Sequence, residues 1–331
     1  MFLSAVSAGL VLTGAAGDQV NRLNAQEQQV WKRMEPRIVT VLQNGRPTGA
    51  AALIDTSGLF VAHRNAVLAD MVQGRMSDGR TVQMTVKGQD SLTQLVLLQV
   101  ADWDAGSVQA FLPPMVNERP GGALLAVLPS GPIRAEHVSS QRFGVVKPSN
   151  RMVPLSEFRF EAPAAEVGTA LVFCENGEFL GALNATLGGP QAVGTSGVGT
   201  NLTDPRTIFN TRPIGPSGLT VAYTTGAQLT RRVLDGFKSE SHEVQYPSLG
   251  VMCNDAIGGG AQVQKVVPNS PAAQAGVRFG DIIVDIAGVV IRNQVDFARV
   301  MLDQEVGKKI VVRIKRGSQM LFMNAVVAKA D

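Results

Sequence analysis

A succession of short apolar runs, each followed by turn residues, fills the sequence from residue 37 to residue 183. Residues 38–42 (IVTVL) precede Asn44 and Gly45, and residues 50–54 (AAALI) precede a DTSG turn. Further runs lie at residues 59–61, 81–86, 94–100, 124–128, 143–146, 170–173 and 179–183. Short runs with almost no helical periodicity favour antiparallel β-barrels or a β-sandwich. The composition agrees, since 35 glycines and an aromatic content of 5% are typical of many turns and short strands.

The last part of the chain, from about residue 246, has a different pattern. Residues 269–276 (NSPAAQAG) combine a serine cap, a proline at the first helical position and a closing glycine, which predicts one short helical turn. Apolar residues at helical spacing predict a longer helix over residues 294–302. The predicted strands of this part lie at residues 248–251, 262–267 and 309–315, and a further strand lies between two turns within residues 279–288. We expect these elements to form a separate small domain.

Three features suit this domain to hold an extended peptide. The turn at Gly250 lets successive backbone N–H groups point at one carboxylate. The strand that follows the turn offers an edge for an added strand, and the helix at residues 294–302 offers the opposite wall. The residues predicted to line the pocket are Leu249, Gly250, Val251, Phe297, Val300 and Met301.

Both parts resemble one protein family. Residues 266–276 (VVPNSPAAQAG), 280–283 (GDII) and 311–317 resemble the PDZ domain of HtrA-family (Deg) proteases in order and spacing. Residues 30–183 resemble the protease domain of that family, for example in the run DTSGLFV at residues 55–61. The resemblance implies a mainly β chain, with a chymotrypsin-like double β-barrel followed by a C-terminal PDZ domain, itself a β-sandwich with two helices.

The chain starts with an apolar segment that ends in small residues and resembles a secretory signal, although no lysine or arginine precedes Arg22. This segment predicts export to the periplasm or the cell envelope. The predicted parts are an apolar segment at 1–17, an exposed lead-in helix at 18–36, a protease-like domain at 37–237 with a long Gly/Thr/Pro-rich loop at 187–218, a linker at 238–245 and a PDZ domain at 246–331.

The catalytic positions of the family carry other residues here. The chemistry needs a serine nucleophile, a histidine that takes its proton, an aspartate that orients the histidine, and donors for the oxyanion. The resemblance places Asn65 at the histidine, Gln94 at the aspartate and Gly168 at the nucleophile. Glu166, an anion, falls where the oxyanion charge would develop. We therefore predict that the chain is not an enzyme but a pseudoprotease of the trypsin-like serine endopeptidase type.

The alternative is an active serine- or threonine-type endopeptidase that uses displaced residues. His63, Asp90 and Thr169 each lie a few residues from the expected positions. Two residues along a strand span about 7 Å, whereas proton transfer requires hydrogen-bond distance. We interpret His63 as a strand or loop residue with hydrogen-bonded ring nitrogens, and Thr169 as the entry to a strand.

Charge and motif content limit the other partners. The net charge is only +3 and the basic residues are scattered, so we expect no nucleic acid partner. Cys174 and Cys253 fall in different predicted domains, and neither a metal-ligand spacing nor a dinucleotide motif occurs, so we expect free thiols, no metal and no cofactor. The predicted function is binding of peptides, protein C-termini or unfolded proteins through the PDZ groove, as a scaffold, adaptor or regulator. An active HtrA-type relative, or another copy of the chain, is a further predicted partner.

Overall fold

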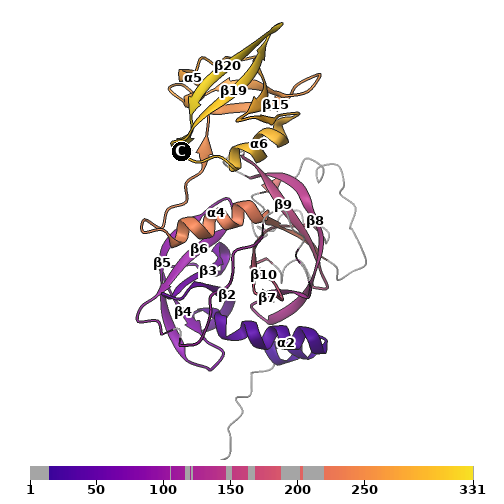
Figure 1. The fold of residues 1–331 in the computed structure, drawn as a ribbon. Helices are drawn as coiled ribbons and strands as arrows, with labels where there is room; N and C mark the ends of the chain where they lie inside the picture. The colour runs from indigo at the N-terminus through magenta and orange to yellow at the C-terminus, as the bar shows by residue number, and fades with distance from the viewer. Residues whose placement is uncertain are drawn as a thin grey trace, which may run out of the picture. The chain divides into compact units, whose positions relative to one another are not determined.

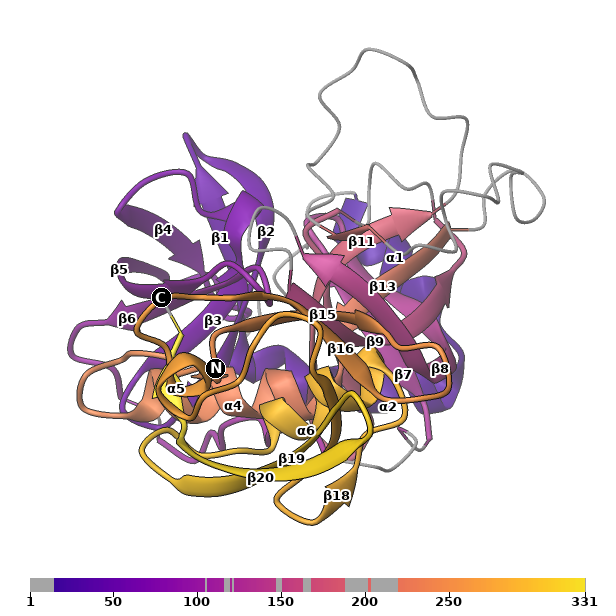
Figure 2. The ribbon, with the colours of Figure 1, turned by 90° about the horizontal axis from the view of Figure 1, so that it is seen from above.

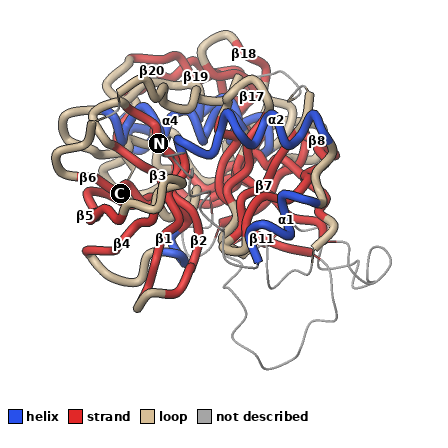
Figure 3. The backbone as a smooth tube through the Cα atoms, turned by 90° about the horizontal axis from the view of Figure 1, so that it is seen from below, coloured by secondary structure: helices blue, strands red, loops and turns tan. Residues whose placement is uncertain are grey.

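Strands dominate the computed structural model of the chain, as the ribbon and the tube coloured by secondary structure show (Figures 1 and 3). The structure describes residues 15–104, 106–115, 120, 122–146, 151–162, 168–187, 202–203 and 220–330. Among these residues, no helix is long and apolar enough to cross a membrane. The predicted apolar segment at residues 1–17 lies mostly outside the described residues. So does the predicted loop at 187–218, apart from its first residue and strand β12 (Leu202–Thr203).

The first barrel closes on itself in the strand order β1-β2-β3-β6-β5-β4, and neighbouring strands are antiparallel. Alternate side chains point inward, and Leu53, Phe60 and Leu98 fill the centre at 0% exposure. Strand β3 is buried at every position, because it lies between two strands and both of its faces are covered. The strands are β1 (Ile38–Gln43), β2 (Arg46–Asp55), β3 (Leu59–His63), β4 (Met71–Arg75), β5 (Thr81–Asp90) and β6 (Leu95–Val100).

The second barrel follows the order β8-β7-β10-β11-β13-β9, and pairing of β8 with β9 closes the ring. Its core contains Ala126, Phe158 and Val172, all at 0% exposure. The strands are β7 (Leu124–Leu128), β8 (Gly131–Val146), β9 (Arg151–Phe160), β10 (Leu171–Cys174), β11 (Phe179–Leu187) and β13 (Thr220–Thr225). Two closed six-stranded barrels confirm the predicted chymotrypsin-like double barrel.

The C-terminal part is an open sheet in the order β15-β16-β17-β19-β20, covered by helices α5 (Pro271–Gln274) and α6 (Gln294–Leu302). Both helices begin where the sequence predicts, since Ser270 caps α5 and Asn293 caps α6 through their side chains. The strands are β14 (Pro247–Ser248), β15 (Val251–Asp255), β16 (Ala261–Val266), β17 (Ile282–Ile286), β18 (Val289–Val290), β19 (Lys309–Arg316), β20 (Gln319–Val326) and β21 (Ala328–Lys329). This arrangement confirms the predicted PDZ-type sandwich with two helices.

The chain divides into two compact units. One consists of Met1–Ser139, Ser156–Thr200 and Arg212–Ala227, and it holds most of both barrels. The other consists of Ser140–Leu155, Asn201–Thr211 and Gln228–Asp331, and it holds the PDZ domain. Helix α4 (Ala227–Lys238) follows β13 and precedes the strands of the PDZ domain.

The lead-in segment differs from the single exposed helix that its polar sequence predicts. It forms α1 (Ala15–Asn21), α2 (Ala25–Met34) and a 3-10 turn, η1 (Glu35–Arg37). Helix α2 contacts β7 and buries one face, including Val30, Trp31 and Met34 (Figure 1). The apolar residues of α2 are few, but they recur at the spacing of one helical face.

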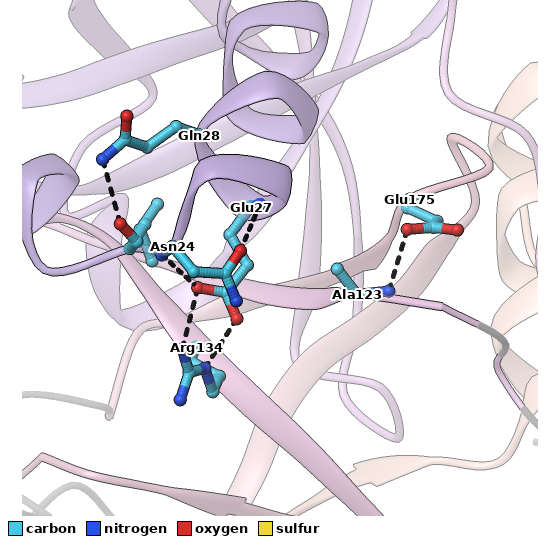
Figure 4. Close-up of polar contacts among 7 residues, drawn as sticks. Asn24, Glu27, Gln28, Ala123, Arg134 and Glu175 are labelled. Carbon is cyan, nitrogen blue, oxygen red and sulfur yellow. Dashed lines mark hydrogen bonds and ion pairs between the residues drawn. The ribbon is translucent and has the colours of Figure 1, made fainter.

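Glu27 ties α2 to the second barrel (Figure 4). Its carboxylate accepts two hydrogen bonds from Arg134 on β8, from Nε at 2.6 Å and from the second guanidinium nitrogen at 3.1 Å. It also closes a capping box with Asn24, whose backbone N–H lies 2.8 Å away. The Glu27 side chain is only 6% exposed, and the hydrogen bonds from Arg134 hold its pKa below the ordinary value. The buried carboxylate therefore depends on a residue more than 100 positions along the chain.

We expect Arg134→Ala to lower the free energy of unfolding of the barrel unit by about 2 kcal/mol, because it leaves a buried carboxylate without its cation. Arg159→Ala is the matched control, since its ion pair with Glu136 joins side chains that are 43% and 62% exposed, and such pairs contribute about 0–1 kcal/mol. Urea unfolding followed by tryptophan fluorescence measures both. Equal losses in the two variants would contradict the role given to Glu27.

Candidate functional site

The turn after β3 carries the first predicted catalytic position. β3 runs into a 3-10 turn, η2 (Arg64–Ala66), which His63 caps by accepting a hydrogen bond at Nδ1 from the backbone N–H of Asn65 (3.0 Å). The N–H of Arg64 donates to the carbonyl of Gln94 at 2.8 Å. Asn65 therefore lies in a turn that is hydrogen-bonded to Gln94, the second predicted catalytic position.

Gln94 occupies a tight turn just before β6. Its backbone is left-handed, with φ of +58°, and its side chain is 5% exposed. The side-chain Nε2 donates to the carbonyl of Ser91 at 2.6 Å, so the amide is used within its own loop. A neutral amide in this place cannot supply the negative charge that a catalytic aspartate supplies.

The third position, Gly168, comes from the second barrel and reaches the same region. The hydroxyl of the next residue, Thr169, donates to the carbonyl of Thr48 at 3.1 Å. The hydroxyl of Thr48 donates in turn to the carbonyl of Ala66 at 2.8 Å. Gly49 allows these segments to pack closely because it has no side chain. A Cβ at this position would lie 2.5 Å from the Cβ of Ala66.

The segments that carry Asn65, Gln94 and Gly168 are thus brought together where the two barrels meet. Glu166 lies outside the described residues. Within the described residues, no group of His, Cys, Asp and Glu side chains is arranged to hold a metal ion.

His63 and Asp90, which belong to the alternative catalytic set, form hydrogen bonds with other groups in the folded chain. His63 is 1% exposed, and its Nε2 donates to the carbonyl of Leu183 at 2.7 Å while Nδ1 accepts from the turn. Asp90 accepts two hydrogen bonds at 2.7 Å from Thr93, one from the backbone and one from the hydroxyl. His63 and Asp90 both pair with Leu95 from opposite sides, which separates their backbones by two strand spacings, about 10 Å.

The ring of His63 is held neutral. Burial lowers its pKa from 6.5 to about 4, and the hydrogen bond to the Leu183 carbonyl offsets only part of that shift. Both ring nitrogens are occupied in the uncharged form, with the proton on Nε2. This agrees with the interpretation of His63 as a hydrogen-bonded strand residue.

The predicted peptide groove lies in the PDZ domain, where α6 runs beside β15 and β16 (Figure 2). Leu249, Val300 and Met301 belong to the buried core, and Val251 and Phe297 are partly buried against it. The first turn of α6 is tied to the end of β15, since the N–H of Gln294 donates to the carboxylate of Asp255 at 2.8 Å. In the described part of the chain β15 pairs with β16 alone, which leaves its other edge open.

The turn before β15 is held from two sides. Gly250 has φ of +73°, and a Cβ there would lie 2.2 Å from the Cβ of Ser270. Its carbonyl accepts a hydrogen bond from the N–H of Val267 at 2.8 Å, and the carbonyl of Leu249 accepts one from the N–H of Ala272 at 3.0 Å. The sequence identified Ser270 only as a helix cap, and nothing in it indicated the tether at Asp255.

The comparisons with known proteins agree with this domain order. A family model described as "PDZ domain" matches residues 240–327. The putative serine protease HhoA of Synechocystis is 23% identical over 291 residues, which cover 85% of this chain and 70% of HhoA. The periplasmic serine endoprotease DegP of Salmonella typhimurium is 25% identical over 299 residues, which cover 83% of this chain but only 56% of DegP. The chain thus spans little more than half the length of that relative.

A solved structure shows the same fold. The HtrA-type protease AlgW, solved with a decapeptide, superposes with a TM-score of 0.65 at 15% identity, and the match covers 92% of this chain and 98% of AlgW.

These relatives contradict the prediction that the chain is not an enzyme. HhoA and DegP are named as serine proteases, and AlgW as a protease, so that prediction is wrong. The prediction aligned three residues of this chain with the catalytic positions of the family. It then assumed that replacement of the catalytic side chains abolishes activity. The fold keeps a hydroxyl, that of Thr169, at the place where the two barrels meet.

The burial of His63 predicts a specific pH dependence. Because its folded-state pKa of about 4 lies below the ordinary 6.5, the stability it contributes is complete above pH 6.5 and is lost as the pH falls toward 4. The loss should be about 3 kcal/mol of unfolding free energy between pH 7 and pH 4. Urea unfolding followed by fluorescence of Trp31 and Trp103 should show this loss in the wild type and in the control His242→Gln. In His63→Gln the loss should be smaller by this amount, and the same slope in all three proteins would refute the argument.

Fold, domain order and relatives lead to one assignment. Two closed barrels precede a PDZ domain, and the solved structures with this arrangement include an HtrA-type protease. The curated relatives that span most of the chain include HhoA and DegP. The chain therefore has a chymotrypsin-like double barrel followed by a PDZ domain, and over this whole arrangement it is similar to the HtrA/DegP serine proteases.

Proposed function

We propose that this chain captures peptides or protein C-termini in the groove between β15 and α6, as a scaffold, adaptor or regulator in the cell envelope. The observation that carries the proposal is the open edge of β15, which starts directly after the Gly250 turn and faces α6. An extended ligand can add to such an edge as a further strand, while turn N–H groups hold its carboxylate. The decapeptide solved with AlgW supports this use of the fold.

The groove offers an apolar wall. Phe297 on α6 and Val251 at the start of β15 are both partly buried against the same apolar core. A ligand whose last side chain is apolar would bury it against this wall, which stabilises the complex in proportion to the area removed from water. A place in the cell envelope is supported by relatives that are named periplasmic.

The groove is tested with fluorescein-labelled peptides that end in a free carboxylate after an apolar residue. They should bind with a dissociation constant of micromolar order. Gly250→Ala should weaken binding by about tenfold or more, because a Cβ meets Ser270 and displaces the turn. Gly258→Ala is the matched control, since Gly258 also has a positive φ (+89°) but has open space around it. Equal affinities in both variants, or no peptide binding by the wild type, would sink the proposal.

Peptide-bond hydrolysis is a second candidate function, favoured by the serine proteases among the relatives. Thr169 would supply the hydroxyl, from its place at the junction of the barrels. Casein cleavage by the purified chain should then be abolished in Thr169→Val. It should persist in Thr48→Val, which also loses one hydroxyl bonded to a backbone carbonyl. Absence of cleavage by the wild type, or equal cleavage by both variants, would contradict this candidate.

Association with an active HtrA-type relative, or between copies of the chain, also stays a prediction, which co-purification from the native host would test.

A further inference from the structure

A hollow of about 440 Å³ opens on the PDZ domain away from the proposed groove. The turn between β17 and β18 forms one side of it, with Ala287 and Gly288. The start of β19 and Phe322 of β20 form the other side. Figure 2 shows β18, β19 and β20 along the same margin of the domain. The hollow shares no residue with the groove at β15, which lies at the opposite end of the strand order.

The lining is cationic. Lys308, Lys309 and Arg313 line the hollow, and Asp285 is the one acidic residue among the lining residues. Asp285 already accepts a hydrogen bond from the N–H of Gly288 at 3.0 Å and lies 3.6 Å from a guanidinium nitrogen of Arg313. Both lysines are exposed, and neither forms an ion pair in the described part of the chain. The hollow therefore carries a surplus of positive charge.

Arg313 has unused capacity to donate hydrogen bonds. Its Nε is buried and lacks a hydrogen-bond partner within the described residues, and its ion pair with Asp285 is long. A buried donor without a partner destabilises the folded state. An anion that entered the hollow and shifted the guanidinium would accept hydrogen bonds from it. We therefore expect Arg313 to make the central contact with the ligand.

Apolar side chains lie between these cations. Val311 stands between Lys309 and Arg313 on the same face of β19, because side chains alternate along a strand, and it is 43% exposed. Phe322 pairs across from Arg313 and is 69% exposed. An aromatic side chain this exposed beside an apolar neighbour is typical of an interaction surface.

We propose that the hollow binds an extended, acidic peptide segment of a partner protein, with carboxylates on both sides of an apolar residue. Lys309 and Arg313 are four residues apart on one strand, which corresponds to about 13 Å. An extended ligand with the order acid, any, apolar, any, acid repeats that spacing. Its apolar side chain would face Val311 and Phe322, and its two carboxylates would face Lys309 and Arg313.

A protein segment fits better than a lipid surface. The cations and apolar side chains line a concave hollow, whereas a bilayer is contacted by side chains that protrude together from a convex or flat face. The alternation of cation, Val311 and cation along β19 also matches the alternation of an extended chain, while headgroups in a bilayer carry no such register.

The test is fluorescence anisotropy of the full chain with a fluorescein-labelled, C-terminally amidated peptide that contains Glu-Thr-Val-Thr-Glu. The amide removes the terminal carboxylate, so failure of the β15 groove would not affect the result. Lys309→Glu should weaken binding by about tenfold or more, and Phe322→Ser by several-fold, at unchanged thermal midpoints. Lys265→Glu is the matched control, since it makes the same charge change at an exposed lysine of β16 outside the hollow.

The glutamine version of the peptide should bind at least about tenfold more weakly than the glutamate version. Equal affinity for the two peptides, or equal affinity of Lys309→Glu and Lys265→Glu, would overturn the proposal. A second experiment measures binding of the full chain to vesicles of phosphatidylcholine and phosphatidylglycerol in equal parts. Binding to these vesicles that depends on Lys309, without binding to the peptide, would replace the peptide ligand by an anionic lipid.

Discussion

Closure of the two barrels is the constraint on which the protease-type unit depends. A closed sheet has no unpaired edge strands, so pairing of β1 with β4 and of β8 with β9 satisfies every strand of both rings. The turns at the barrel rims then come together from distant parts of the sequence. The hydrogen-bond chain from Thr169 through Thr48 to Ala66 is one result, and it joins the rim of the second barrel to that of the first.

The same closure explains the state of His63. Strand β3 is part of the ring and is buried along its whole length, so the imidazole is shielded from solvent and takes backbone partners from both barrels. Burial then keeps the ring neutral well below its ordinary pKa. A histidine held in this way stabilises the contact between the barrels, and it has no free nitrogen with which to accept a proton from a nucleophile.

The PDZ sheet is open where the barrels are closed, and its edges and exposed face are available for ligands. β15 has an open edge in the described part of the chain, and β19 and β20 expose Val311, Met320, Phe322 and Val326. A domain of this size cannot cover both faces of a twisted sheet with two short helices. The two binding surfaces proposed above therefore arise from one property, the incomplete coverage of the sheet.

Local sequence signals determined much of this protein. The turn-punctuated apolar runs predicted the barrels. The cap at Ser270 placed α5, because a cap is decided by residues within one helical turn, and the spacing of apolar residues over 294–302 placed α6. Only the tertiary structure decided the rest. Glu27 is buried because Arg134 arrives from another strand, and the hollow exists because the β17–β18 turn stands beside β19. The activity of the family could not be predicted from three aligned positions either, since catalysis depends on groups that converge only after the barrels close. Local hydrogen bonds are encoded by neighbouring residues, whereas burial, pairing of distant charges and convergence of a site depend on segments that meet only in the folded chain.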